Sequence, residues 1–161
     1  MVFDAKEFDP QVTLRYRLTP DHSMFARWAQ AYKAGGFDTG VTSINTSLED
    51  LVFEPESAET WEIGSKGNLL NGRARYDIAL FWTEFLDFQI TVPTGDPDDP
   101  FLNVNAGKQR VRGAEFNTTM AVTDQLRLSL SGAVMDGQMV FFPAGGCTTE
   151  DRVNFEQSGC D

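Results

Sequence analysis

Apolar and polar residues alternate along several stretches of this chain, and the alternation limits what the chain can fold into. In the segment 59–67, ETWEIGSKG, Trp61 and Ile63 alternate with Glu62 and Gly64. Side chains of a β-strand point to opposite sides in turn, so a period of two residues predicts a strand with two unlike faces. Such a strand needs an apolar medium on one side, which is either a protein core or lipid.

Three pairs of alternating segments follow one another, and each pair is joined by a short turn. The first turn contains Pro20, which fixes φ, and Asp21, which can bond its own backbone. Asn71-Gly72 in the second turn is a strong hairpin signal because both residues tolerate a positive φ. We therefore predict consecutive antiparallel strands at residues 10–18, 23–33, 58–68, 73–91, 104–121 and 126–136.

Short and long connections alternate along the chain. The short ones lie at 19–22, 69–72 and 122–125. The long ones lie at 34–57, at 93–103 and after Asp136, and are rich in Gly, Pro, Asp and Asn. In an up-and-down array this order puts every short turn at one edge and every long loop at the other. Transmembrane β-barrels have this asymmetry. The run from 73 to 92, expected to be unbroken, also exceeds the usual length of a soluble strand.

One face of the predicted strands carries many charges, which suits a wide, hydrated lumen. These charges are Arg15, Arg17, Glu62, Lys66, Arg73, Arg75, Asp77, Glu115 and Arg127. A soluble β-sandwich with a charged outer face explains the same alternation, but it buries the apolar residues. The barrel interpretation instead predicts one exposed apolar face with Leu14, Tyr16, Tyr76, Ile78, Leu80, Phe116, Leu128 and Leu130.

Composition argues against several classes of function. The chain has 13 Lys and Arg against 24 Asp and Glu, a net charge of −11, so it would repel a phosphate backbone and nucleic acid is a poor partner. No apolar run approaches the about 20 residues of a membrane helix. With His22 as the single histidine, we find no catalytic triad, zinc-ligand cluster or phosphate loop. We therefore expect no enzyme activity, no metal and no cofactor.

Four short motifs occur in a fixed order along the chain. They are Tyr-Lys-x-Gly-Gly-Phe at 32–37, Pro-Glu at 55–56, Glu-x-Gly-x-Lys at 62–66 and Gly-x-Glu at 113–115. They lie within the stretches FDPQVTLRYRLTPDHSMFARWAQAYKAGGFDTG, FEPESAETWEIGSKGNLLNGRARYDIALFWTEFLDFQI and NAGKQRVRGAEFNTTMAVTDQLRLSLSGAVMDG. This series, in this order and spacing, resembles the middle-to-late barrel of the TonB-dependent outer-membrane receptors. The resemblance covers the chain up to about Gly137.

The resemblance implies an all-β fold, an antiparallel up-and-down transmembrane β-barrel segment with long outer loops and short periplasmic turns. It implies about six strands of a barrel of about 22. Residues 1–161 are then a partial barrel domain, because the family's plug, TonB-binding segment (TonB box) and C-terminal strand are not found in the sequence.

The function implied by the resemblance is uptake of iron–siderophore complexes, or of a similar scarce nutrient, across the bacterial outer membrane. The implied partners are outer-membrane lipid, the plug domain, TonB and the nutrient ligand. The alternative from a different class is a soluble all-β carbohydrate- or ligand-binding module.

The charged face supplies four lumen-facing candidates, which are Glu62, Lys66, Arg75 and Glu115. They either contact the plug or ligand, or form an inter-strand charge ladder that faces water, and we favour the ladder. Two strand glycines, Gly64 and Gly113, either allow close approach of the plug or relieve barrel curvature, and we favour curvature.

The two cysteines, Cys147 and Cys160, lie close together in a polar segment and enclose 12 residues, TTEDRVNFEQSG. Neighbouring glycines give the backbone the freedom to bring the two sulfurs together. We predict a disulfide between them, in an outer loop that faces the cell exterior, over the alternative of two free thiols.

Overall fold

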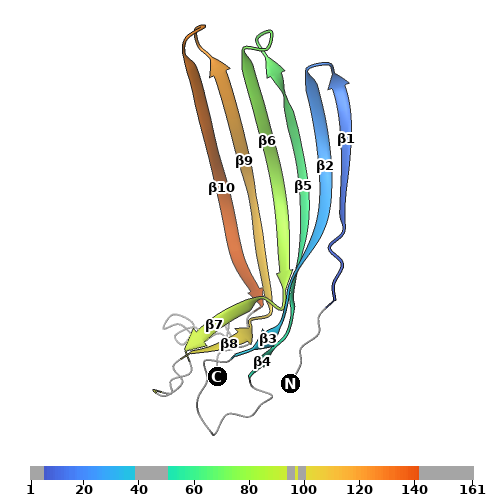
Figure 1. Ribbon diagram of the computed structural model, residues 1–161, viewed down its shortest axis with the longest axis vertical. Coiled ribbons are helices and arrows are strands. Elements are labelled where there is room, and N and C mark those ends of the chain that lie inside the picture. Colours follow the sequence, from blue (N-terminus) through green and yellow to red (C-terminus); the bar gives the residue numbers. More distant parts are fainter. Residues whose placement is uncertain (1–5, 39–50, 94–96, 98–100, 142–161) are drawn as a thin grey trace, which may run out of the picture.

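Six long strands form one antiparallel sheet in which sequence neighbours among the six are also neighbours in space (Figure 1). The structure is a computed structural model and describes residues 6–38, 51–93, 97 and 101–141. The strand order is β1-β2-β5-β6-β9-β10, and every adjacent pair is antiparallel. The bounds are β1 Gln11–Thr19, β2 His22–Lys33, β5 Glu56–Leu69, β6 Ala74–Leu86, β9 Lys108–Ala121 and β10 Arg127–Phe141. The six predicted antiparallel strands are confirmed.

Two of the predicted strands are shorter than expected, because each is broken near the long-connection end. The prediction of an unbroken strand over 73–91 is wrong: β6 ends at Leu86, and Asp87 has a φ of 53°. The strand predicted over 104–121 is likewise broken at Gly107, where φ is 86°. The two bends bind each other, since the Phe88 N–H donates to the Gly107 carbonyl (3.1 Å) and the Ala106 N–H donates to the Phe88 carbonyl (2.6 Å).

The long connections carry two short antiparallel sheets of their own. One pairs β3 (Gly36–Phe37) with β4 (Val52–Phe53), and the other pairs β7 (Gln89–Pro93) with β8 (Phe101–Asn105). Both lie at the same end of the long strands, opposite the three tight turns, and β7 and β8 turn away from the long axis (Figure 1). The predicted separation of short turns from long connections is therefore confirmed for the described residues. The strand predicted to end at 136 continues to Phe141.

The first tight turn depends on a residue other than the one expected, whereas the second turn forms as predicted. Asp21 was expected to stabilise the first turn, but Thr19 does so, because its Oγ1 accepts from the N–H of Asp21 (3.3 Å) and of His22 (3.1 Å). In the second turn Asn71 and Gly72 have positive φ as predicted, and Leu70 adopts it as well. A threonine hydroxyl that binds the backbone two or three residues ahead is a recognised turn motif.

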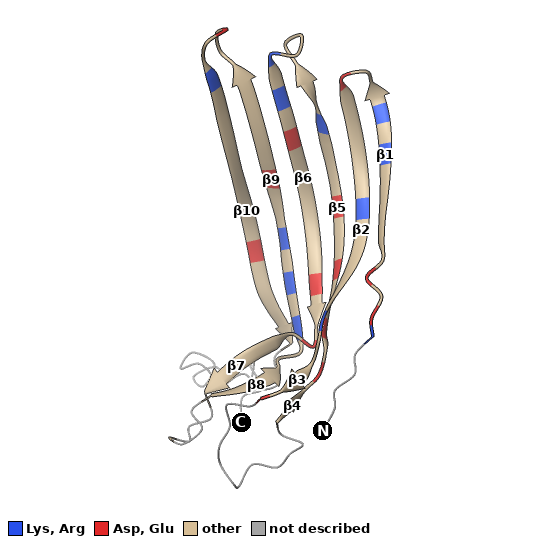
Figure 2. Cartoon of the chain, viewed as in Figure 1, with Lys and Arg blue, Asp and Glu red and all other residues tan. Residues whose placement is uncertain are grey.

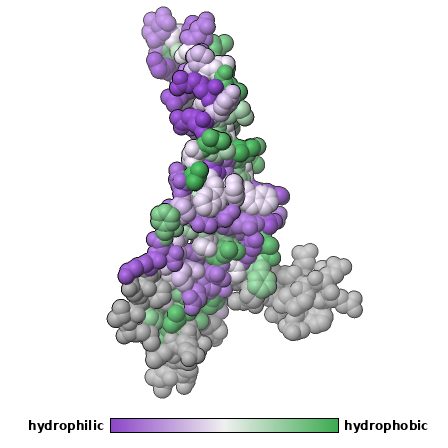
Figure 3. Space-filling view, turned by 90° about the vertical axis from the view of Figure 1, so that its right-hand side faces the viewer, coloured by the Kyte–Doolittle hydropathy of each residue, from purple (hydrophilic) through white to green (hydrophobic). Residues whose placement is uncertain are grey.

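The sheet has one apolar face and one charged face, which we name by these terms below. Among the described residues no large side chain is fully buried, so the sheet has no conventional core. Leu14 is 71% exposed and Leu80 is 57% exposed, which is incompatible with the soluble sandwich, where both would be buried. Seen edge-on, hydrophilic and hydrophobic residues gather on opposite sides in the half near the tight turns (Figure 3). Seven of the eight residues predicted for the exposed apolar face are exposed, namely Leu14, Tyr16, Ile78, Leu80, Phe116, Leu128 and Leu130.

Tyr76 is the exception, and it lies in a small polar cluster with Ser65 and His22. Tyr76 is half-buried because its hydroxyl hydrogen-bonds with Ser65 Oγ (3.0 Å) and lies 3.2 Å from His22 Nδ1. The two rings are 5.9 Å apart. His22 is also half-buried and forms part of this polar cluster on the apolar face.

All three tryptophans lie in one row across the apolar face. The register pairs Trp28 of β2 with Trp61 of β5, and Trp61 with Trp82 of β6. The Trp28 and Trp61 rings are 6.3 Å apart. Beyond this row, toward the long connections, the next residues on the same face are Gln30, Glu59 and Glu84, so the row marks where the apolar surface ends.

No helix among the described residues is long and apolar enough to cross a membrane.

Candidate functional site

The charged face is built by strand parity, because every second residue of each long strand points to the same side of the sheet. Register pairs Glu62 with Phe81 and Lys66 with Asp77, which places Glu62, Lys66, Arg75 and Asp77 on one side. Glu115 joins them, since it is opposite Ala79 of β6. Figure 2 shows the charges spread along the strands rather than gathered at one point.

Two of the four candidate residues pair with a neighbour in the sheet. Lys66 Nζ lies 3.1 Å from Asp77 Oδ2 and 4.7 Å from the centre of the Phe25 ring. Arg27 Nη1 lies 3.7 Å from Glu62 Oε2. All four charged side chains are partly exposed, so each pair contributes little stability and mainly fixes side-chain orientation.

The other two candidates, Arg75 and Glu115, form no ion pair with any described residue. Both side chains are exposed. Thr118 Oγ1 donates to the backbone carbonyl of Arg75, and the Arg75 side chain takes no part in that hydrogen bond. Their charges are therefore free to meet a group from outside the sheet.

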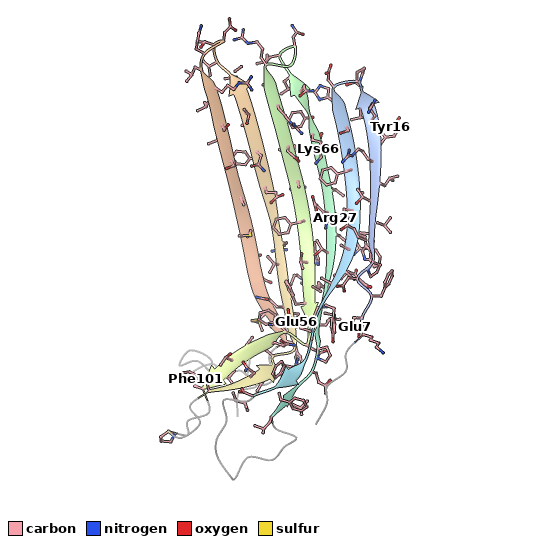
Figure 4. The ribbon with its side chains drawn as sticks, in the orientation of Figure 1. Glu7, Tyr16, Arg27, Glu56, Lys66 and Phe101 are labelled. Carbon is pink, nitrogen blue, oxygen red and sulfur yellow. The ribbon has the colours of Figure 1, made fainter. Side chains whose placement is uncertain are left out.

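The four candidates do not converge on one compact site. Lys66 and Glu62 are four residues apart on β5, a rise of about 13 Å. Lys66 lies toward the tight turns, and Glu56 lies at the opposite end of the same strand (Figure 4). The arrangement is an extended ladder of charges, with no geometry for general acid–base or nucleophilic chemistry.

A hollow on the charged face involves two arginines that were not among the candidates. Arg15 and Arg17 of β1 border it together with Lys66 and Arg75, and its volume is about 360 Å³. The row Arg17–Ser23–Lys66 explains the hollow, because the small Ser23 of β2 lies between two long cationic side chains. The alternation in QVTLRYRL puts Arg15 and Arg17 on the charged face, but their approach to Lys66 depends on strand register.

The two strand glycines of the charged face lie beneath phenylalanine rings. Register pairs Gly64 with Phe25 and Gly113 with Phe81. A Cβ at Gly64 would lie 2.5 Å from the Phe25 ring, and one at Gly113 would lie 2.8 Å from the Phe81 ring. Each glycine therefore provides the space for an aromatic ring from the neighbouring strand.

A polar network fixes the long connections against the ends of β2 and β5. Glu56 is buried, at 8% exposure, and its Oε2 accepts from the Gln89 N–H (2.9 Å) and lies 3.8 Å from Lys33 Nζ. The Gln89 side chain donates to the carbonyls of Ala34 and Glu54, both at 3.0 Å. Because Glu56 and Lys33 belong to the charged face, the start of β7 lies over that face.

The second short sheet is tied to the first by an asparagine and an aspartate. Asn105 Nδ2 donates to the carbonyls of Glu54 (2.9 Å) and Asp87 (2.7 Å). Asp38 Oδ2 accepts from the N–H and the Nδ2 of Asn103, at 2.9 and 3.0 Å. The described parts of the connections 34–57 and 93–103 thus form one hydrogen-bonded unit at the end of the charged face.

The predictions about a metal site and about a disulfide concern different parts of the chain. No group of three or more His, Cys, Asp or Glu that could hold a metal occurs in the part of the chain that the structure describes. Cys147 and Cys160 lie outside the described residues, so their predicted disulfide stays a prediction.

A wide antiparallel sheet with one exposed apolar face, a charged opposite face and tight turns at one end defines the class: this is wall of a transmembrane β-barrel. The comparison with family models gives the particular family. The model for the β-barrel of TonB-dependent receptors ("TonB dependent receptor-like, beta-barrel") matches residues 2–154. The chain belongs to this family, whose members are receptors for transport, not enzymes.

Two curated relatives are named as a receptor for a metal complex and as a probable siderophore receptor. The chain is 28% identical over 130 residues to the metal-pseudopaline receptor CntO of Pseudomonas aeruginosa, covering 81% of this chain and 17% of the relative. It is 24% identical over 153 residues to the probable TonB-dependent siderophore receptor PiuA of Acinetobacter baumannii, covering 91% of this chain and 20% of the relative. The chain thus spans about a fifth of the length of these relatives.

Solved structures agree on the fold. The ferric yersiniabactin uptake receptor FyuA of Yersinia pestis matches with a TM-score of 0.65 and 23% identity, over 80% of this chain and 18% of that chain. The siderophore receptor PirA of Pseudomonas aeruginosa matches with a TM-score of 0.63 and 19% identity, over 80% of this chain and 25% of that chain. The six-stranded sheet therefore has the fold of part of a TonB-dependent receptor barrel.

Proposed function

We propose that this chain forms about six strands of the barrel wall of a TonB-dependent receptor in a bacterial outer membrane. The observation that carries the proposal is the exposed apolar face backed by a charged face, with no conventional core among the described residues. Lipid covers the apolar face, and water in the lumen of the barrel solvates the charged face. The remaining strands and a plug domain would come from other parts of the receptor.

We further propose that the cargo is a metal–siderophore complex. The support comes from the relatives, since CntO is named for metal-pseudopaline and PiuA as a probable siderophore receptor. In this proposal the linked short sheets form part of the outer mouth, where a ligand first meets the receptor. TonB then supplies the energy that moves the plug.

The charged face has a defined role in this proposal. The charges of Glu62 and Lys66 are used within the wall, by Arg27 and Asp77. Arg75 and Glu115 have no ion pair within the described wall, so their charges are the ones that meet the plug. The prediction of an inter-strand ladder then applies to the first pair, and the prediction of plug contacts applies to the second.

An uptake assay tests the cargo and the energy source. Cells that lack their own siderophore receptors would express the full-length receptor and receive radiolabelled iron as hydroxamate, catecholate and hydroxycarboxylate siderophores. We expect uptake of one class that requires both the receptor gene and TonB. Uptake that persists without TonB, or no uptake and no surface binding of any class, would contradict the proposed function.

Two sets of variants test the charged face. Arg75→Gln and Glu115→Gln should lower uptake about tenfold while surface binding is retained, because a buried contact loses its charged partner. Lys66→Gln is the matched control, since Asp77 already uses its charge, and its uptake should change little. An equal loss of uptake in all three variants would contradict the proposal that Arg75 and Glu115, and not Lys66, contact the plug.

A further inference from the structure

The hollow on the charged face has a local surplus of positive charge. Arg15, Arg17, Lys66 and Arg75 line it, and Asp21 is the one carboxylate among the described residues that line it. Figure 2 shows Lys and Arg residues on β1, β5 and β6 close to the tight turns. Because the whole chain has a net charge of −11, its composition does not account for this surplus.

The cations of the hollow differ in how much of their charge is already used. Lys66 Nζ lies 3.1 Å from Asp77 Oδ2, so this side chain forms the wall of the hollow but its charge is matched. Arg75 belongs to β6 and is assigned to the plug in the proposed function. Arg15 and Arg17 are exposed and form no ion pair with any described residue. They are therefore the two cations that are able to bind a small anion.

The two arginines form a pair on one strand. They are two residues apart on β1, a rise of about 7 Å, and point to the same side of the sheet. Register places Phe25 beside Arg15 and the small Ser23 beside Arg17, with Lys66 beyond Ser23. The volume of about 360 Å³ is close to the lower limit of about 300 Å³ for small-molecule sites, so a small ligand fits the hollow better than a protein segment does.

Toward the long connections, carboxylates match the cations of the charged face. Arg27 Nη1 lies 3.7 Å from Glu62 Oε2, and Lys33 Nζ lies 3.8 Å from Glu56 Oε2. The unmatched cations of β1 therefore lie near the tight turns, the end that the proposed function places at the periplasm. A surplus of one sign of charge on the wall of a hollow raises the local concentration of ions of the opposite sign.

We propose that Arg15 and Arg17 bind carboxylates of the cargo as it leaves the lumen, so that the cargo is an anionic metal complex with free carboxylates. This inference rests on the proposed function, because it requires the charged face to line the lumen. A guanidinium presents parallel N–H donors in one plane, and a carboxylate presents two oxygens that match them. Of the three siderophore classes, the hydroxycarboxylates offer this group. A hydroxamate or catecholate complex without a carboxylate gains nothing from the pair.

Binding of citrate to the full-length receptor tests the site directly. Asn68 also lines the hollow, so a trifluoromethyl label on Asn68→Cys reports on the hollow by fluorine NMR of the receptor in detergent. At low ionic strength, where screening is weak, citrate should shift the label's resonance to saturation and its uncharged triethyl ester should not. Arg15→Gln with Arg17→Gln should weaken citrate binding about tenfold or more.

Arg127→Gln is the matched control, because it removes the same charge from the charged face on β10, outside the hollow, and it should bind citrate as the wild type does. The absence of a citrate-dependent shift, an equal shift with the ester, or equal weakening in Arg127→Gln would overturn the site. Arg15 and Arg17 are exposed, so the double variant should fold, and heat-modifiability on gels checks this.

Uptake separates this inference from the proposed function. We expect TonB-dependent uptake of the hydroxycarboxylate complex, about tenfold lower in the double variant with surface binding unchanged, because the pair lies at the exit end. TonB-dependent uptake of a hydroxamate or catecholate complex alone, or wild-type uptake by the double variant, would overturn the inference and leave the proposed function intact. Uptake of no class would contradict the proposed function itself.

Discussion

At the residue scale, the glycines of the charged face show how one missing side chain serves the neighbouring strand. The relief of barrel curvature by Gly64 stays a prediction, and the ring of Phe25 occupies the space that a side chain at Gly64 would take. Lys66 then lies over the same ring, 4.7 Å from its centre. The glycine, the ring and the cation form one unit that spans β2 and β5.

This arrangement predicts a large difference between two glycine-to-alanine substitutions. A Cβ at Gly64 would lie 2.5 Å from both the Ile78 carbonyl and the Phe25 ring, so Gly64→Ala should lower the free energy of unfolding by about 1–3 kcal/mol. Gly137→Ala is the control, because its nearest atom, Val111 Cγ2, is 3.9 Å away. Denaturant unfolding of the receptor in detergent measures both, and equal stability of the two variants would contradict this interpretation.

At the element scale, the long strands could be predicted from the sequence, whereas the breaks within them could not. The alternation in β5 and β6 and the turn signal at Asn71-Gly72 depend on neighbouring residues, so local patterns are sufficient. The stretch FLDFQIT, residues 85–91, contains no glycine or proline that would predict a break at Asp87. The break is stabilised by backbone hydrogen bonds of Phe88 with Ala106 and Gly107. That pairing joins residues far apart in sequence, which no local pattern reveals.

The anchoring of the long connections gives a prediction at the same scale. Glu56→Ala removes the acceptor of the Gln89 N–H, and an unmet buried donor costs about 1–3 kcal/mol. Amide hydrogen exchange in β7 and β8 should then become about tenfold faster or more, while the centre of β6 is unchanged. Glu56→Gln keeps an acceptor oxygen and should stay near wild type. If both variants loosen β7 equally, the ion pair with Lys33 is the anchor instead.

At the scale of the whole molecule, the two faces of the sheet could be predicted from the sequence. The pairing of charged side chains between strands could be predicted only in part. Strand parity alone assigns Glu62, Lys66, Arg75 and Glu115 to one side, and the structure agrees. Which charges pair depends on register across strands, so the sequence did not reveal that Lys66 meets Asp77 or that Arg15 and Arg17 approach Lys66. The cations Lys108, Arg110 and Arg112 of β9 were missed for a different reason, because they lie on the otherwise apolar face.

The central claim is that the apolar face meets lipid, and the three tryptophans test it together. Trp28, Trp61 and Trp82 are the three tryptophans of this chain and form one row at the edge of the apolar surface, where aromatic residues of membrane proteins meet the headgroups. The measurement is fluorescence quenching of the receptor in vesicles, with tryptophans outside this chain replaced by phenylalanine. We predict strong quenching by lipids brominated near the headgroup and weak quenching by aqueous acrylamide. Strong acrylamide quenching with no effect of brominated lipid would contradict the account.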